Sequence, residues 1–431
     1  MLVDGEHYPP VTREAVAAAT AAGHAVVGAA FLGGKEKLKG EPILPEIDLE
    51  VGASLVSSLR QALDRFAPEV VLDLSDAPVL GSSDRMMLAS VALSRGVRYQ
   101  GRGFNLDPPE RPRLSSRRTI SVIGSGKRTG KTAICAELAR ETRRRGQVPL
   151  IVAMGRGGPP EPVVTRGAER PLSVETLIAL AEAGEHASTD AYEDAIVARC
   201  TTVGARRGGA GLNGQPYTHT VHEAIELAEK EPHDVMFLEG SGTAIPPASG
   251  DSTVLVIGAA TTDEDLYSGL CDIRFIDAHA MILTATDAPG YEPSRRLHQI
   301  EQRYARLELE MPLAVRTVFE LEPLEPIQGA SVLLATTAPA WAHERMVDRI
   351  ESLGARCVGI TRSLSDRQAL RADLDSFGAA PDTLLTEVKA AGIDVAASYA
   401  QARGWRVVLC DNVPVAADEA SSLSRVADAI L

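Results

Sequence analysis

Residues 119–132 read TISVIGSGKRTGKT, a β-type apolar run followed by a glycine-rich turn. The turn leads into a Gly-Lys-Thr sequence that opens a helix, which we predict over residues 131–145. In such a turn successive backbone N–H groups converge on a phosphate, and the positive end of the helix dipole adds to the attraction. The segment therefore predicts a phosphate-binding loop between a strand at residues 119–123 and a helix. The alternative is a glycine-rich turn that only packs a helix against a sheet.

The side chains of this loop have predictable roles toward ATP. Lys131 would reach the β- and γ-phosphates, and Thr132 would hold Mg²⁺. Lys127 would be a second phosphate ligand or, as the alternative, a solvated loop lysine. The pattern G-x-x-x-x-G-K-[ST] expects glycine at position 125, so Ser125 has to follow the same backbone path. The residues predicted to bind ATP are Gly124, Ser125, Gly126, Lys127, Arg128, Thr129, Gly130, Lys131, Thr132 and Ala133.

A phosphate-binding loop of this type needs a carboxylate from a neighbouring strand, because Mg²⁺ has to be held from a second side. Glu239 follows the predicted buried strand 234–238 and is the main candidate metal ligand, with a solvated loop glutamate as the alternative. Asp190, at the start of a predicted helix, is a second candidate, and Glu193 and Asp194 follow it. The helix dipole favours acidic residues at helix starts in any case, so a structural role for these three is an equal alternative.

Two arginine- and glycine-rich segments stand out, at residues 153–160 and 204–211, and we interpret both as loops. In open α/β sheets the loops at the carboxyl ends of strands form the ligand crevice. Guanidinium groups grip phosphate with two hydrogen bonds, which indicates an acceptor that is itself polyanionic. Surface arginines on flexible loops are the alternative. The residues predicted to bind the acceptor are Arg156, Arg206, Arg207, Gly240 and Ser241, and those predicted to act in catalysis are Lys127, Lys131 and Arg156.

The composition limits the classes of partner. The chain has 431 residues with 58 acidic and 44 basic side chains, and its formal charge is −14. This balance argues against a general nucleic-acid or anionic-membrane surface, because sequence-independent binding to either needs net cationic patches. No apolar run approaches the ~18 residues of a membrane span. The five scattered cysteines form no CxxC pair and are typical of a reducing cytosol, so we expect a cytoplasmic protein without nucleic-acid or membrane partners.

Short apolar runs alternate with helical patterns along almost the whole chain, which is the signature of βαβ units. We therefore predict an α/β protein with mainly parallel sheets, in which a central P-loop NTPase domain follows an N-terminal α/β domain. A polar stretch rich in proline and arginine, residues 102–118, marks the first boundary, and a weaker one falls near residues 319–328. The predicted domains are residues 1–112, 113–325 and 326–431, with the last packing onto the central sheet as an alternative to standing alone.

Charged residues also follow strands in the N-terminal domain. Asp4, Glu6 and His7 come after the first apolar run, and Asp73 and Asp76 follow another. A metal or acid–base site is one interpretation, but the spacing matches no established ligand motif. Turns rich in aspartate and proline are common after strands, so we slightly favour a structural role.

Several segments together resemble cyclic 2,3-diphosphoglycerate synthetases, and the resemblance runs the length of the chain. The segments that carry it are 3–8 (VDGEHY), 73–76 (DLSD), 124–132 (GSGKRTGKT), 152–158 (VAMGRGG), 206–207 (RR), 238–247 (LEGSGTAIPP), 336–339 (TTAP), 387–391 (EVKAA) and 410–414 (CDNVP). The resemblance implies an ATP-dependent, Mg²⁺-requiring closure of 2,3-bisphosphoglycerate into a cyclic phosphoanhydride, with ADP and phosphate as products. It also implies a homodimer.

Similarity to other protein families bears on the metal ligands and on the alternative functions. The EGSG sequence that starts at Glu239 is similar to the metal-binding segment of dethiobiotin synthetases, which implies Glu239 as one Mg²⁺ ligand and Asp190 or Asp194 as a second. One alternative function is an ATP-dependent kinase or ligase for another anionic small molecule. The other is a P-loop ATPase switch that moves a protein partner. The extra lysine of partition-type ATPases stands five residues before the main one, whereas Lys127 stands four before Lys131, which weakens the switch interpretation.

Overall fold

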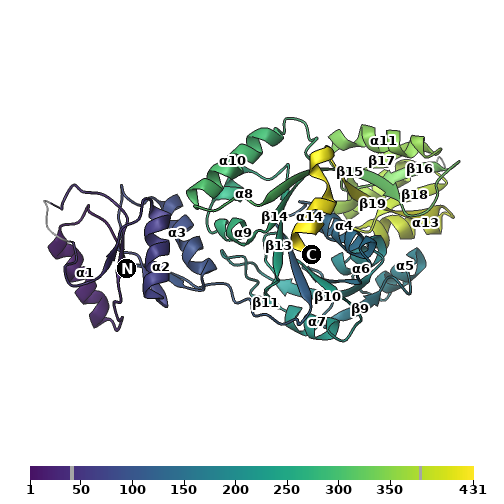
Figure 1. Ribbon diagram of the computed structural model, residues 1–431. Helices are drawn as coiled ribbons and strands as arrows, with labels where there is room; N and C mark the ends of the chain where they lie inside the picture. Colours follow the sequence, from purple (N-terminus) through teal and green to yellow (C-terminus); the bar gives the residue numbers. More distant parts are fainter. Residues whose placement is uncertain (39–42, 378–380) are drawn as a thin grey trace.

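A computed structural model describes residues 1–38, 43–377 and 381–431 of the chain. Figure 1 shows a small N-terminal lobe beside a larger body that contains the rest of the chain. None of the helices in these ranges has the length and apolar character of a membrane-spanning segment.

The N-terminal lobe is an α/β unit built on short sheets. Its elements are β1 (Leu2–Val3), α1 (Pro9–Ala21), β2 (Ala29–Phe31), β3 (Leu49–Glu50), α2 (Leu55–Phe66), β4 (Val70–Leu72), α3 (Ser82–Ser94), β5 (Arg98–Gly101) and β6 (Phe104–Leu106). The strand orders are β1–β2–β3 and β4–β5–β6, and a parallel bridge between Leu2 and Asp73 links the two sheets. This bridge places the segments that follow β1 and β4 side by side.

The larger body is organised around one mainly parallel sheet. Its strands are β7 (Arg118–Gly124), β8 (Pro149–Gly155), β9 (Val163–Arg166), β10 (Thr201–Gly208), β11 (Thr218–His219), β12 (Val235–Glu239), β13 (Ser252–Gly258), β14 (Ala280–Thr284), β15 (Leu313–Pro323), β16 (Ser331–Ala335), β17 (Arg356–Thr361), β18 (Thr383–Glu387) and β19 (Arg406–Ala416). Within the described residues the order is β11–β10–β8–β12–β7–β13–β14–β15–β19–β18–β16–β17, with β9 beside β10. The contacts of β10 with β9 and β11, and of β15 with β19, are antiparallel. The predicted α/β class is confirmed.

Helices cover both faces of this sheet (Figure 1). They are α4 (Lys131–Arg144), α5 (Val174–Glu182), α6 (Asp190–Val197), α7 (Val221–Ala228), α8 (Asp263–Tyr267), α9 (Asp272–Asp277), α10 (Pro293–Arg306), α11 (His343–Ser352), α12 (Arg367–Ser376), α13 (Ser398–Ala402) and α14 (Leu423–Ile430), with short turns η1 (Ala340–Ala342), η2 (Ser363–Ser365), η3 (Gly392–Ala397) and η4 (Glu419–Ser421). Successive residues of β7 point to opposite faces. Ile120 and Val122 therefore join the core under α4 and α6, whereas Ile123 joins the core shared with α3 of the N-terminal lobe.

The C-terminal segment continues the sheet of the phosphate-loop region. β15 pairs in parallel with β14 through residues 313–316 and antiparallel with β19 through residues 317–323. This one strand runs through the weak boundary predicted near residues 319–328 and joins the two parts edge to edge. The loops of the C-terminal strands consequently reach the same edge of the sheet as the phosphate loop. That residues 1–112, 113–325 and 326–431 form separate domains stays a prediction.

The interpretation of residues 204–211 as a loop is wrong, because β10 extends through Gly208. The glycines and arginines of this segment conceal a strand alternation in which Ala205 and Arg207 are buried and Arg206 is exposed. The polar stretch 102–118, predicted as a boundary, contains β6, which forms a hairpin with β5.

Candidate active site

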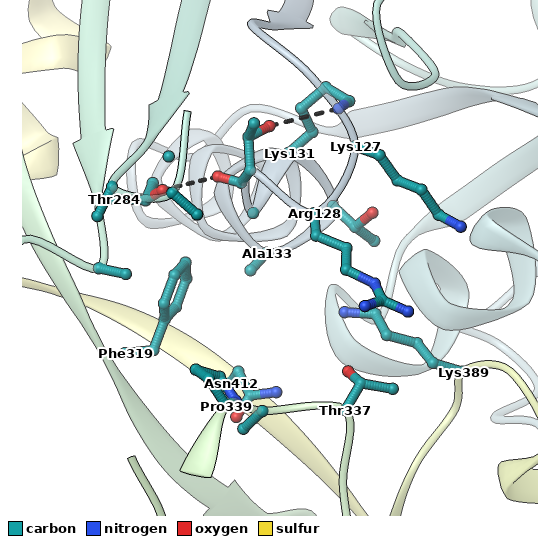
Figure 2. Close-up of a pocket in the computed structure, with 18 of the residues that line it drawn as sticks. Lys127, Arg128, Lys131, Ala133, Thr284, Phe319, Thr337, Pro339, Lys389 and Asn412 are labelled. Atoms are coloured by element: carbon teal, nitrogen blue, oxygen red, sulfur yellow. Dashed lines mark hydrogen bonds between the residues drawn. The ribbon is translucent and has the colours of Figure 1, made fainter. Parts of the chain in front are cut away.

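The phosphate loop connects the end of β7 to the start of α4, as predicted. Gly130 has a φ of 87° at the N-cap of α4, and Arg128 has a φ of 61°. Lys131 folds back over the loop, where its Nζ donates a 2.7 Å hydrogen bond to the carbonyl oxygen of Gly126 (Figure 2). A Cβ on Gly124 would lie 2.8 Å from this Nζ, so the path of the lysine requires glycine there. The missing side chain of Gly124 therefore leaves space for the side chain of Lys131.

Ser125 occupies the position where the sequence pattern expects glycine. Its backbone N–H donates to the carbonyl oxygen of Val256 on β13 at 3.0 Å, and its hydroxyl lies 2.8 Å from Oγ1 of Thr261. The buried serine thus extends the pairing of β7 with β13. Thr284, at the end of β14, donates from Oγ1 to the carbonyl oxygen of Thr129 at 2.7 Å (Figure 2). The ends of β13 and β14 therefore anchor the loop.

The loop forms one wall of a cavity of about 1230 Å³. Other walls come from the segments that follow β8, β12, β13 and β14, and from the C-terminal segment. These segments lie at the carboxyl ends of parallel strands, where ligands bind in open α/β sheets. Lys127 and Arg156 are exposed toward this cavity, and none of the ion pairs among the described residues involves either of them. The cavity therefore contains two cationic groups that form no ion pair within the described residues.

Lys131 is the buried cation of the site. Burial lowers its pKa to about 8, while the charges of Glu239 and Asp190 oppose the shift. An ammonium group that has already lost its hydration gains strongly from an anion placed beside it. The environment of Lys131 therefore suits a bound phosphate better than it suits water.

Glu239 ends β12 directly beside the phosphate loop. Thr132 Oγ1 donates a 2.7 Å hydrogen bond to Oε1 of Glu239, whereas Oε2 is buried and receives none from a hydroxyl or N–H group. The buried carboxyl of Asp194 lies beside Glu239 and shares a side-chain hydrogen bond with it. Burial, followed by the charge of Asp190, raises the pKa of Glu239 to about 7. Mg²⁺ prefers oxygen ligands and commonly takes one or two carboxylates together with substrate phosphates. The buried carboxylate beside a threonine hydroxyl therefore fits this ion.

The three acidic residues of the predicted helix start occupy different places. Asp190 lines the cavity. Glu193 forms an ion pair with Lys389 of the C-terminal segment at 2.8 Å. Asp194 is fully buried near Glu239 outside the cavity lining, and burial is the main cause that raises its pKa well above the usual range. Of the three, Asp190 is thus the one that faces the cavity, although within the described residues no three His, Cys, Asp or Glu side chains converge into a complete metal centre.

Arg156 and Arg207 converge on the glycine loop after β12. A Cβ on Gly242 would lie 2.5 Å from Nη2 of Arg156 and 3.3 Å from Nη2 of Arg207, so the two guanidinium groups require glycine there. Arg207 is 8% exposed and donates to the carbonyl oxygens of Ser241 at 2.7 Å and Gly209 at 2.6 Å. Burial, and then the charge of Arg156, lowers the pKa of Arg207. Arg156, Gly240, Ser241 and Gly242 line the cavity, whereas Arg207 lies behind this wall and supports it through its hydrogen bonds to backbone carbonyl oxygens.

Arg206 does not join this pair. Neighbouring residues of a strand point to opposite faces, so β10 turns Arg207 inward and Arg206 outward. The side chain of Arg206 is exposed, and its backbone N–H donates to Thr220 Oγ1 at 3.1 Å. The structure does not bring Arg206 to the cavity, because the assumed loop is a strand.

The sequence assigned no role to the C-terminal residues that close the cavity. Figure 2 shows these side chains opposite the phosphate loop: Phe319, Thr337, Pro339, Lys389 and Asn412. A signal was present, because several of them follow short apolar runs of the strand type, at residues 332–335, 383–385 and 407–410. Without the order of strands in the sheet, that signal did not indicate which cavity the segments would reach.

Comparison with known proteins identifies the family. Profiles described as the N-terminal, P-loop and C-terminal domains of cyclic 2,3-diphosphoglycerate synthetase match residues 1–107, 119–316 and 323–413. A relative with the name cyclic 2,3-diphosphoglycerate synthetase from Rubrobacter xylanophilus is 40% identical over 430 residues, covering 99% of this chain and 96% of the relative. The chain belongs to the cyclic 2,3-diphosphoglycerate synthetase family.

Other members of the cyclic 2,3-diphosphoglycerate synthetase family match over similar lengths. The protein of that name from Methanothermus fervidus is 35% identical over 448 residues, covering 100% of this chain and 95% of the relative. The one from Thermococcus kodakarensis is 36% identical over 426 residues, covering 97% and 95%. The family predicted from the sequence is confirmed along the whole chain.

Solved structures give more distant likenesses. LpxK from Aquifex aeolicus, in a structure with ATP, has a TM-score of 0.42 and 12% identity, covering 74% of this chain and 91% of LpxK. A ParA family ATPase from Chlorobium tepidum has a TM-score of 0.22 and 11% identity, covering 66% of this chain and 98% of the ATPase. We base no argument on likenesses at these TM-scores.

Proposed function

We propose that this chain uses ATP to close 2,3-bisphosphoglycerate into cyclic 2,3-diphosphoglycerate, with release of ADP and phosphate. The observation that supports this proposal most strongly is one cavity, in a chain of this family, in which the phosphate loop with Lys127 faces Arg156, and neither of these cations forms an ion pair within the described residues. The phosphate loop suits ATP, and the arginine wall suits an acceptor that carries phosphates itself.

The reaction we propose has two displacements. First, an oxygen of one substrate phosphate attacks the γ-phosphorus of ATP, the bond from this phosphorus to the β–γ bridging oxygen breaks, and ADP leaves. The product is a phosphoanhydride on that substrate phosphate. Second, an oxygen of the neighbouring phosphate attacks the activated phosphorus that remains attached to glycerate, and orthophosphate leaves as the ring closes. Both attacking oxygens are already anionic, so neither displacement requires a general base.

What the reaction requires from the protein is neutralisation of charge. ATP and a bisphosphate bring many negative charges into one cavity, and their repulsion would oppose approach of the reacting atoms. Lys127 and Lys131 would neutralise the nucleotide phosphates, and Arg156 would contact the transferring group or the acceptor. Arg207 would hold the wall on which the acceptor lies. Fixed cationic groups of this kind stabilise a phosphoryl transition state without reorganisation.

Magnesium belongs to the same proposal. Thr132 and Glu239 would hold the ion, with Asp190 as a second carboxylate that faces the cavity. When bound, Mg²⁺ neutralises charge on the β- and γ-phosphates. The support for this assignment is the buried carboxylate of Glu239 beside the hydroxyl of Thr132.

The experiment that tests the proposed function is phosphorus NMR of the purified protein with ATP, Mg²⁺ and 2,3-bisphosphoglycerate, with each component omitted in turn. We expect a cyclic phosphoanhydride together with ADP and orthophosphate, only in the complete mixture. ADP formation that depends on another anionic acceptor would indicate a different kinase or ligase. ATP hydrolysis stimulated by a protein partner, without a phosphorylated product, would indicate a switch ATPase.

The assembly state is a further part of the proposal. We expect a homodimer, on the strength of the family resemblance alone. Sedimentation equilibrium of the full chain at several concentrations tests this expectation, and a monomer at all concentrations would contradict it.

A further inference from the structure

The cavity has a second end, built by the C-terminal part of the sheet. Phe319 comes from β15, Asn412 from β19 and Thr337 from the segment after β16, and all three side chains line the cavity. In Figure 2 Asn412 and Pro339 lie across the cavity from the phosphate loop, and Phe319 stands to one side of them. This end contains an aromatic ring, a proline and one amide, and its cation, Lys389, is already paired with Glu193 at 2.8 Å, so it differs in character from the wall that carries Arg156.

A hydrogen bond to Glu387 orients the side-chain amide of Asn412. Its Nδ2 donates a 3.0 Å hydrogen bond to Oε1 of Glu387. Glu387 also accepts hydrogen bonds from Thr336 Oγ1 at 2.6 Å and from the hydroxyl and backbone N–H of Thr337 at 2.7 and 3.2 Å. An ionised carboxylate only accepts, so it selects the nitrogen of the asparagine and leaves the amide oxygen without this contact. Asn412 therefore offers the cavity a carbonyl oxygen as an oriented acceptor.

The surroundings of this amide suit a flat, largely apolar group. The ring of Phe319 packs against the phosphate loop so closely that a Cβ on Gly130 would lie 2.6 Å from its Cζ. Pro339 and Trp341 also line the cavity, and Trp341 is 38% exposed. Aromatic rings and proline offer faces on which a planar ring system stacks. An aromatic base with a polar edge fits this end of the cavity better than a second phosphate would.

We propose that Asn412 reads the base of the bound nucleotide and selects adenine, by accepting a hydrogen bond from its 6-amino group. Asparagine pairs well with adenine, because the amide oxygen accepts from the 6-amino group and the amide N–H donates to a ring nitrogen. A purine with oxygen at position 6 would place an acceptor against the acceptor oxygen of Asn412. This assignment relies on the proposed function for the presence of a nucleotide on the phosphate loop.

The test compares three diphosphates by isothermal calorimetry with the full chain and Mg²⁺. ADP carries the 6-amino group, purine riboside 5′-diphosphate has hydrogen at that position, and inosine 5′-diphosphate has oxygen. We expect the unmodified chain to bind ADP about 5- to 10-fold more tightly than either analogue, the range for one net hydrogen bond. Asn412→Ala should bind all three with similar affinity. Asn412→Ser should do the same while keeping a hydroxyl donor for Glu387.

The matched control is Asn105→Ala, which removes an exposed asparagine of β6 far from the cavity lining and should keep the full preference. Equal binding of all three nucleotides by the unmodified chain would overturn the proposal. So would Asn412 variants that lose affinity for all three equally, because that pattern indicates a structural role through Glu387. The chain could prefer ADP through Asn412 and still form no cyclic product. That result would support the role of Asn412 in selecting adenine and refute the proposed reaction. Failure of every nucleotide to bind would refute both.

Discussion

Two groups of charged residues lie at the carboxyl ends of parallel strands, one in the N-terminal lobe and one in the central sheet, and their hydrogen bonding differs. In the N-terminal lobe Asp4 accepts from His7 Nδ1 at 2.8 Å. Asp73 accepts from Arg85 Nε at 2.7 Å and from the hydroxyl of Tyr99 at 2.8 Å. Each of these carboxylates is satisfied by groups of its own lobe.

In the central sheet some charged groups lack a partner of opposite charge. Glu239 is hydrogen-bonded by Thr132 and Asp194 but forms no ion pair, and Arg156 takes part in none of the ion pairs among the described residues. Such groups are costly in a protein that has no use for them, because a buried or converging charge needs a counter-charge. The comparison teaches that spacing of acidic and basic residues after strands does not distinguish a site from a structural cluster. Charged groups that lack an ion-pair partner and line one cavity, as Lys127 and Arg156 do, indicate a site.

The largest expected effect is at the phosphate loop. Lys131→Ala should lower cyclisation by about 1000-fold or more, because it removes the fixed cation beside the transferring phosphoryl group. Phosphorus NMR and ADP release measure this loss. Lys230→Ala, which alters an exposed lysine just after α7, is the matched control and should leave the rate unchanged. Near-normal cyclisation by Lys131→Ala would end the assignment of the phosphate loop.

Glu239→Gln should reduce kcat by roughly 100-fold at saturating Mg²⁺, because the amide keeps the shape of the side chain but is a poor metal ligand. The melting temperature should not fall, since burial already disfavours the charged form of Glu239, whose pKa is raised to about 7. Calorimetry of Mg²⁺ with ADP measures the lost metal affinity. Glu226→Gln, at an exposed position of α7, serves as the control. Unchanged Mg²⁺ dependence would show that Glu239 is not a metal ligand.

The N-terminal cluster should respond in stability rather than in chemistry. Asp73→Asn should lower the free energy of unfolding by about 2 kcal/mol, because it leaves the partly buried Arg85 without its carboxylate. Chemical denaturation measures the change, and kcat of the folded variant should stay the same. Asp64→Asn, which alters an exposed ion pair with Arg95, should change stability by less than about 0.5 kcal/mol. If Asp73→Asn lowered kcat without changing the free energy of unfolding, the N-terminal lobe would contain a second functional site. That outcome would contradict the contrast between the two groups of charged residues.

The smallest expected effect separates two neighbours on β10. Arg207→Ala should raise KM for 2,3-bisphosphoglycerate by about 10-fold, because the wall at Ser241 loses the charge-assisted hydrogen bonds that hold it, with a smaller change in kcat. Arg206→Ala should change KM by less than about twofold, because a surface charge contributes little. Initial rates over a range of substrate concentrations measure both. Equal effects of the two substitutions would contradict the inward and outward assignment of this strand.

The phosphate loop was predictable because all of its determinants are local. A strand, a glycine-rich turn and Lys131 at a helix start lie within fourteen residues, and they bind phosphate through groups of the same segment. Glu239 was also predictable as a carboxylate after a buried strand. The roles of Arg206 and Arg207 could not be separated, because glycines beside them concealed the strand that turns them to opposite faces.

The sequence by itself determined the fold class, the family and the phosphate loop, since hydrophobic periodicity and short motifs act through neighbouring residues. Only the tertiary structure decided which remote segments meet. β15 joins the two parts of the sheet, so Phe319, Glu387 and Asn412 reach the cavity of a loop that lies far from them in the chain. Likewise, Asp190 faces the cavity while Glu193 pairs with Lys389. Strand order and side-chain direction set these contacts, and both are properties of the assembled sheet rather than of any one segment.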